Sequence, residues 1–196
     1  MDGYVVVPRE KSLSLVYLIA NLCCMLAPEK HSPAIESLVK KMIAVGACNA
    51  KILEQLVFEA QTFVKEGEVC SILLLDEDGL LRNGASPGLP DDYLNAIDGI
   101  KPDPNFGTCA AAAATGNIVI TSDFFSDNRW PELRHLPLAL GYLGAWSNPI
   151  KSADGKILGT FGTYFRSNRV PSSEEIEHIQ LLSCLAAKIV EGTPTL

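Results

Sequence analysis

The chain has 196 residues, of which 47% are hydrophobic, enough to fill the core of one domain of ordinary size and an appended segment. It has 23 acidic and 16 basic residues and no cluster of Lys and Arg, so no binding to DNA or RNA is expected. The 6 cysteines lack the spacing of a zinc site, as expected of reduced thiols in a cytoplasmic protein.

The first 45 residues are predicted to be a helical extension. Residues 1–11 show no sustained period, whereas residues 12–27 are apolar enough to form a helix. Their apolar run follows basic residues, as in a signal peptide, but at about 15 residues it is shorter than the roughly 20 that cross a bilayer. Pro28 also spoils the cleavage position. We therefore expect a buried or dimerising helix and no membrane insertion.

Two further helices are predicted before the first strand. Ser32 is a candidate N-cap, Pro33 suits the first helical position, and apolar residues then recur at helical spacing up to Gly46. A second helical pattern starts at Asn49 and is expected to end near Gly67, because a glycine often follows the last turn.

The middle of the chain combines a hairpin with a long connection. An apolar run within residues 68–76 predicts a central strand, which an acidic, glycine-containing turn joins to a return strand at 80–85. Several prolines then mark a long connection with one short helix at 91–97. Thr108 is the candidate cap of an alanine-rich helix at 109–115.

The last third alternates loops, strands and helices. The predicted elements are a strand at 118–121, a helix at 129–140 interrupted by Pro137, strands at 142–150 and 156–166, and a final helix that starts within 171–175. Helices at both ends around hairpin-forming strands predict an antiparallel sheet with helices on at least one face.

Ordered sequence matches point to a family. They lie at residues 70–76, 84–90, 96–99, 107–109, 127–130, 145–150 and 154–161. With these matches the chain resembles the GAF family, specifically bacterial GAF domains attached to histidine kinases and cyclic-di-GMP enzymes. The resemblance covers residues 46–192, which leaves 1–45 as the extension and 193–196 as a tail. It implies an α+β fold with five or six antiparallel strands, terminal helices on one face, and a pocket roofed by loops and short helices on the other.

The resemblance implies a small-molecule sensor in signal transduction rather than an enzyme. Its output would pass through a homodimer formed by the N- and C-terminal helices, or to a kinase or cyclase partner in two-component or cyclic-di-GMP signalling. Leu140, Leu143 and Ala145 stand where the family commonly has His, Arg and Cys. If these positions face the cavity, they favour an apolar or weakly polar ligand, or a module that binds none.

The candidate ligand-binding residues are those expected to border the pocket: Cys109, Thr108, Trp146, Ser147, Tyr164 and Trp130. A cap at Thr108 would place Cys109 in a first helical turn, where the helix dipole favours a thiolate. The alternative is a small buried hydrophobe. Trp146, Ser147 and Tyr164 lie on the two strands expected to floor the pocket, and both tryptophans could instead be plain core residues.

No catalytic, metal or cofactor site is predicted. His135 and His178 have no second ligand at local spacing and are expected to be solvated. The alternative function is a free methionine sulfoxide reductase, a type of enzyme that resembles GAF domains and carries a Gly-x-Cys segment like residues 107–109. This chemistry needs an attacking thiolate, here Cys109, and a second thiol, for which Cys70 would have to serve.

Overall fold

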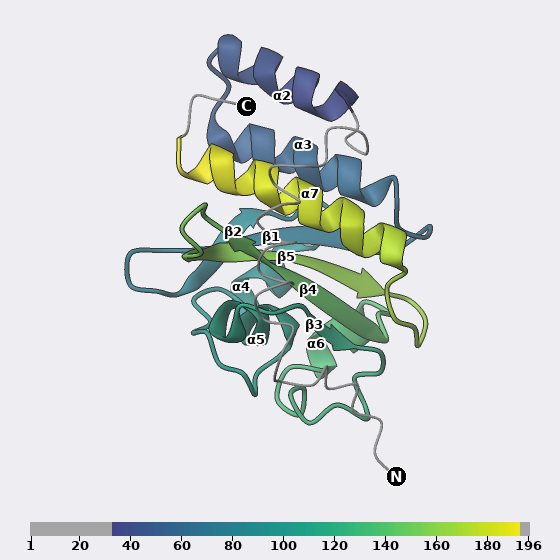
Figure 1. Cartoon of the computed structure of the whole chain (residues 1–196). Coiled ribbons are helices and arrows are strands. Elements are labelled where there is room, and N and C mark those ends of the chain that lie inside the picture. Colours follow the sequence, from purple (N-terminus) through teal and green to yellow (C-terminus); the bar gives the residue numbers. More distant parts are fainter. Residues whose placement is uncertain (1–32, 193–196) are drawn as a thin grey trace, which may run out of the picture. The chain divides into compact units, whose positions relative to one another are not determined.

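The computed structural model describes residues 33–192, and its centre is a five-stranded antiparallel sheet in the order β2-β1-β5-β4-β3 (Figure 1). The strands are β1 Val69–Leu75, β2 Leu81–Ala85, β3 Val119–Thr121, β4 Gly144–Lys151 and β5 Ile157–Phe165. The sheet and its layers of helices confirm the predicted α+β fold. The helix predicted at 12–27 and the cap at Ser32 lie outside the described residues.

Helices cover both faces of the sheet. They are α2 Pro33–Ala44, α3 Asn49–Gln61, α4 Asp91–Ala96, α5 Thr108–Thr115, α6 His135–Ala139 and α7 Ser173–Val190. The helices α3 and α7 pack on one face, which we call the helix face, and α2 lies beyond them (Figure 1). The helices α4, α5 and α6 lie on the other side, which we call the pocket face. No helix within residues 33–192 is long and apolar enough to cross a membrane.

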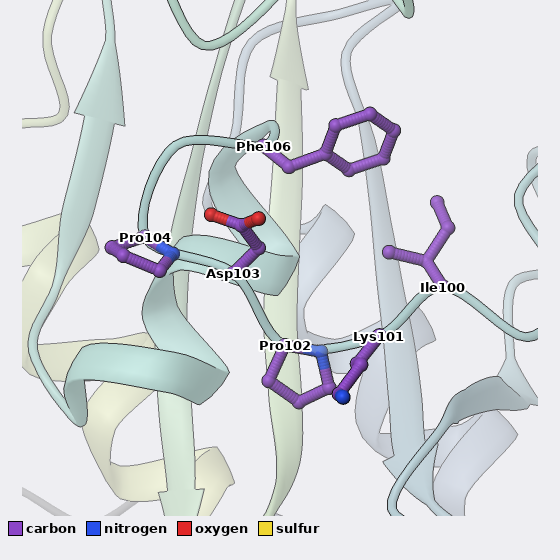
Figure 2. A pocket seen from close by; sticks show the side chains of 6 residues that line it. All are labelled: Ile100, Lys101, Pro102, Asp103, Pro104 and Phe106. Carbon is purple, nitrogen blue, oxygen red and sulfur yellow. The ribbon is translucent and has the colours of Figure 1, made fainter.

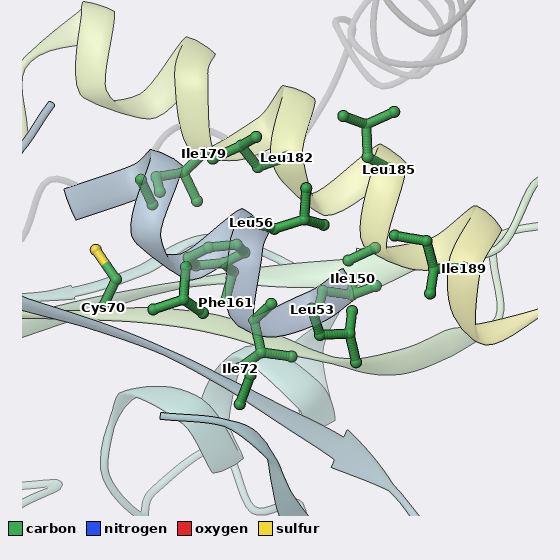
Figure 3. Close-up of a cluster of buried hydrophobic side chains, with 14 of the residues drawn as sticks. Leu53, Leu56, Cys70, Ile72, Ile150, Phe161, Ile179, Leu182, Leu185 and Ile189 are labelled. Carbon is green, nitrogen blue, oxygen red and sulfur yellow. The ribbon is translucent and has the colours of Figure 1, made fainter. Parts of the chain in front are cut away.

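The larger core fills the space between the sheet and the helices α3 and α7 (Figure 3). Leu56 of α3 and Leu182 of α7 are fully buried there against Phe161 of β5. Cys70 lies in the same cluster, where its thiol contacts the Thr163 hydroxyl at 3.6 Å. The apolar stripes of both helices are therefore used to bind the sheet.

The start of α7 confirms the helix predicted to begin within residues 171–175. Ser172 is its N-cap, and its hydroxyl accepts the backbone N–H of Glu175 at 3.1 Å. The Glu175 carboxylate in turn accepts the backbone N–H of Ser172 at 2.7 Å. This reciprocal capping box fixes the first turn of the helix.

Three helix boundaries differ from the sequence predictions. The helix α3 ends at Gln61 rather than near Gly67. The stretch predicted as a helix at 129–140 is helical only in α6, where Pro137 occupies a first-turn position that needs no backbone N–H. Gly107, not Thr108, is the N-cap of α5, with a φ of 60° that favours glycine.

Candidate functional site

A glycine lets α5 approach the centre of the sheet on the pocket face. Gly162 of β5 pairs with Ser71 of β1 and with Ser147 of β4, so these three residues form one row across the strands. A Cβ on Gly162 would lie 3.2 Å from both the Cys109 sulfur and the Ser71 hydroxyl. Glycine within a strand therefore creates the space that the Cys109 side chain occupies.

Cys109 lies in a group of hydroxyls. Its Sγ is 3.2 Å from Ser147 Oγ, and the Ser147 hydroxyl donates to Thr108 Oγ1 at 3.0 Å. Burial raises the pKa of the Cys109 thiol, and hydrogen bonds with Ser147, Thr160 and Thr108 only partly offset this effect. The expectation of a thiolate activated by the helix is therefore wrong, because loss of solvent outweighs the favourable position in the first turn.

Next to this group is a cavity of about 30 Å³, which we call the inner cavity. It has room for only one or two water molecules, since a water needs roughly 10–15 Å³ of such volume. Its polar side chains are Thr108, Cys109, Tyr93 and Tyr164, and Trp130 contributes a large aromatic surface. Its other side chains are apolar, and no charged residue lines it within the described part of the chain. The predicted pocket is thus present, but small.

Two tyrosines form its polar wall. The Tyr93 hydroxyl donates to the Tyr164 hydroxyl at 2.8 Å, and the two rings meet edge to face with centroids 5.8 Å apart. Burial raises the pKa of both phenols, so both remain protonated at neutral pH. The wall can therefore donate hydrogen bonds but carries no charge.

The structure brings five of the six candidate residues together and separates Trp146 from them. Trp146 belongs to the helix-face core and is 1% exposed. Its expected place in the pocket is wrong, because adjacent strand residues point to opposite faces and Ser147 takes the pocket side. Trp130 is buried beside the cavity, and its indole N–H donates to the Thr121 hydroxyl at 2.9 Å.

Sequence reasoning missed Tyr93, Gly162 and Thr160. A glycine inside a strand is a signal of close approach and could have identified Gly162. Tyr93 and Thr160 had no such signal, since only the packing of α4 and β5 brings them to Tyr164 and Cys109.

The histidines occupy different environments. His135 is exposed, whereas His178 is 9% exposed and stacks on Phe63 with ring centroids 3.5 Å apart. Burial lowers the pKa of His178. The expectation that His178 is solvated is wrong, because α7 presents it to the segment after α3. Among residues 33–192, no group of three or more His, Cys, Asp or Glu could hold a metal ion.

A small cavity on one face of the sheet and packed helices on the other define a small α+β domain. The model of the GAF domain family matches residues 50–191, so the chain belongs to this family. It is 38% identical over 154 residues to a methyl sulfide methyltransferase-associated sensor from Methanosarcina acetivorans. The match covers 78% of this chain but only 15% of that relative.

Solved structures share the fold at low sequence identity. A domain of a putative two-component sensor histidine kinase from Sinorhizobium meliloti superposes with a TM-score of 0.60 at 20% identity, covering 72% of this chain and 90% of that one. A type II free methionine-R-sulfoxide reductase from Thermoplasma acidophilum superposes with a TM-score of 0.55 at 16% identity, covering 74% and 96%. The fold thus occurs both in sensor proteins and in an enzyme. The fold therefore does not decide the function, which has to be inferred from the residues of the site.

Proposed function

We propose that the chain is a regulatory module that binds a small, uncharged molecule in the inner cavity. The observation that carries this proposal is the lining, which combines apolar side chains and a hydroxyl pair without any charged residue. An ion moved into such a site would lose its hydration without gaining a partner. The printed name of the Methanosarcina relative, a sensor, agrees with a regulatory role.

The tyrosine pair indicates which neutral molecules fit. Two phenol protons are present, and the bond between Tyr93 and Tyr164 uses one of them. A buried donor without a partner costs about 1–3 kcal/mol, so an occupant that offers an acceptor atom is favoured over a hydrocarbon of the same shape. The remaining candidate contacts, Cys109, Thr108, Ser147 and Trp130, would fix its orientation.

The output is proposed to pass through the helices of the other face, to a second copy of the chain or to a kinase or cyclase partner. The strands β4 and β5 connect the two sides, because Ser147 and Tyr164 face the pocket while Phe161 faces α7. A ligand that favours one arrangement of these strands therefore changes the packing of α7.

Native mass spectrometry of the full chain as purified tests the proposal, since a retained ligand and the oligomeric state appear together. For an empty protein we would add dimethyl sulfide, which the name of the Methanosarcina relative suggests, together with dimethyl sulfoxide and the anion methylthioacetate as related small probes. NMR should show shifts at cavity residues such as Leu73 and Ile97 with a neutral probe and none with the anion. Binding of the anion alone would contradict the proposal. It would also be contradicted if the purified protein held no ligand and bound none of the three probes.

The reductase alternative is disfavoured by the positions of the thiols. Cys109 is on the pocket face, whereas Cys70, the partner that it would need, is fully buried on the helix face. The raised pKa of Cys109 further reduces the thiolate that would attack a sulfoxide. We therefore propose that the chain does not catalyse this reaction. Consumption of methionine sulfoxide with a thiol reductant by the wild type, and not by Cys109→Ser, would overturn this view.

A further inference from the structure

A second hollow lies on the outer side of the inner cavity. We call it the outer groove, and it is a surface depression of about 570 Å³ formed by the segment that connects α4 to α5 (Figure 2). Lys101 and Asp103 are exposed at its border, and Pro102 and Pro104 form part of its wall. It is large enough for a small molecule, whereas the inner cavity must widen before it can hold one.

Two side chains separate the groove from the cavity. Ile100 and Phe106 line both spaces, and among residues 33–192 no other residue does. Figure 2 shows them on the same side of the groove, and both pack against the apolar cluster around Tyr164. Both are partly exposed, so they lie between solvent and the interior.

The segment that carries these side chains is anchored at its two ends. The Ile100 carbonyl accepts the N–H of Leu81 at 2.9 Å, which joins one end to the sheet edge. At the other end, the Gly107 N–H donates to the Arg129 carbonyl at 2.8 Å. Residues 101–106 form a strap between these two fixed points.

The middle of the strap is weakly attached. In the described part of the chain, its one hydrogen bond to the rest of the domain runs from the Asp103 N–H to the Ala110 carbonyl at 3.2 Å. Pro102 and Pro104 have no N–H to donate, and the bond from Asn105 N–H to Asp103 stays within the strap. Lifting the strap therefore breaks one long hydrogen bond and the contacts of Phe106, while both ends hold.

We propose that the outer groove and the inner cavity are two compartments of one ligand site, and that Phe106, with Ile100, is the gate between them. This inference rests on the proposed function for its ligand, but the movement itself occurs without one. A molecule binds first in the open groove, and displacement of the Phe106 ring joins the two spaces. The gate also limits the size of the occupant, because joining the two spaces enlarges the cavity toward the strap.

Cys109 provides a reporter for this movement, because it lines the inner cavity but not the groove. The full chain is treated with N-ethylmaleimide, a small neutral reagent to whose double bond a thiol adds, and each cysteine is followed by peptide mass spectrometry. Cys70, fully buried on the helix face, reports global unfolding in the same sample. No ligand has to be known.

Phe106→Ala should speed the modification of Cys109 at least about tenfold and leave that of Cys70 unchanged, since it opens the gate without unfolding the domain. Ile100→Ala should act in the same direction. Two control substitutions should have much smaller effects: Leu136→Ala, which enlarges the cavity away from the groove, and Phe125→Ala, which removes an exposed ring elsewhere.

An unchanged Cys109 rate in Phe106→Ala, or an equal acceleration in Leu136→Ala, would overturn the gate. Modification of Cys109 and Cys70 at matching rates in every variant would also overturn it, because the cavity would then be reached only by unfolding. These results are independent of the probe-binding experiment. A gate without binding of any probe would leave the movement of Phe106 standing, and refute both the proposed function and the ligand site that rests on it.

Discussion

Gly162 determines how closely α5 can lie on the sheet. The space above its Cα is filled by the Cys109 sulfur and by the hydroxyls of Ser71 and Ser147. Each of these groups comes from a different element, so one missing Cβ sets the packing of three elements around the site. The same crowding contributes to the burial that raises the pKa of this partly exposed thiol.

We expect Gly162→Ala to destabilise the domain by about 1–3 kcal/mol, because the new methyl group must push the Cys109 side chain aside. The measurement is urea unfolding followed by circular dichroism. Cys109→Ala in the same chain should restore part of the loss, since it removes the atom 3.2 Å from the new Cβ. A double variant that is no more stable than the additive sum would show that the clash lies elsewhere.

At the scale of elements, a buried ionic group fixes the first turn of α7, the proposed output helix. Arg169 donates to Glu68 before β1 at 2.9 Å and to Glu175 in α7 at 2.6 Å. Its guanidinium also lies 3.9 Å from the centre of the Phe165 ring. The arginine therefore holds together the start of β1, the end of β5 and the start of the proposed output helix.

Arg169→Met should cost about 3 kcal/mol in unfolding free energy, because it leaves the buried Glu68 carboxylate without its partner. Thermal or urea unfolding measures the loss. Arg134→Met, which removes an arginine that stacks on the exposed Phe125 ring, is the matched control and should change stability far less. Similar losses in both variants would show that the ionic group does not stabilise the domain.

The same group predicts a dependence on pH. Burial by itself would raise the pKa of Glu175, but hydrogen bonds from Arg169 and from the Ser172 N–H outweigh it and lower that pKa below 4.5. A carboxyl whose pKa is lower in the folded than in the unfolded state stabilises the fold at pH values above its unfolded-state pKa. This stabilisation is lost as the pH falls through the folded-state pKa. Urea unfolding should therefore show a steeper loss of stability below pH 4.5 in the wild type than in Glu175→Gln. Equal slopes would contradict this assignment.

At the scale of the whole molecule, exposed apolar side chains gather on the helices α2 and α3. Leu38, Ile43 and Phe58 are 38%, 43% and 47% exposed, whereas Ile35 and Val39 of α2 and Leu56 and Val57 of α3 are buried. Large apolar side chains left exposed on neighbouring helices are a candidate surface for association. This surface is where the dimer predicted from the terminal helices would form, and we propose that its occupant is a second copy of the chain.

Phe58→Glu should convert a dimer into a monomer, because it places a charge within an apolar contact. Sedimentation velocity of the full chain gives the masses. Phe125→Glu, an equally large change at a ring that is 64% exposed near the pocket face, should leave the dimer intact. A wild-type chain that sediments as a monomer, or a dimer that survives Phe58→Glu, would refute this surface.

Much of the fold could be predicted because patterns among neighbouring residues determine its helices, strands and turns. The apolar run of β1, the glycine turns of the hairpins and the Ser172–Glu175 capping signal depend on nearby residues, and the structure has each of them. The candidate site was predictable in part. Ordered family matches pointed to Cys109 and Ser147, and these side chains do meet across the pocket face.

Tertiary structure decided what depends on distant contacts. Strand periodicity separates Trp146 from Ser147 but does not say which of them faces α7, and the packing of the helices assigned Trp146 to that core. Burial likewise shifts the pKa of Cys109 in the direction opposite to the expected one. Packing also places the His178 ring against Phe63 rather than in solvent. By itself, the sequence determined the elements, their order and the family. The site's electrostatics and the small volume of its cavity came from packing, because burial is a property of the neighbours that folding brings together.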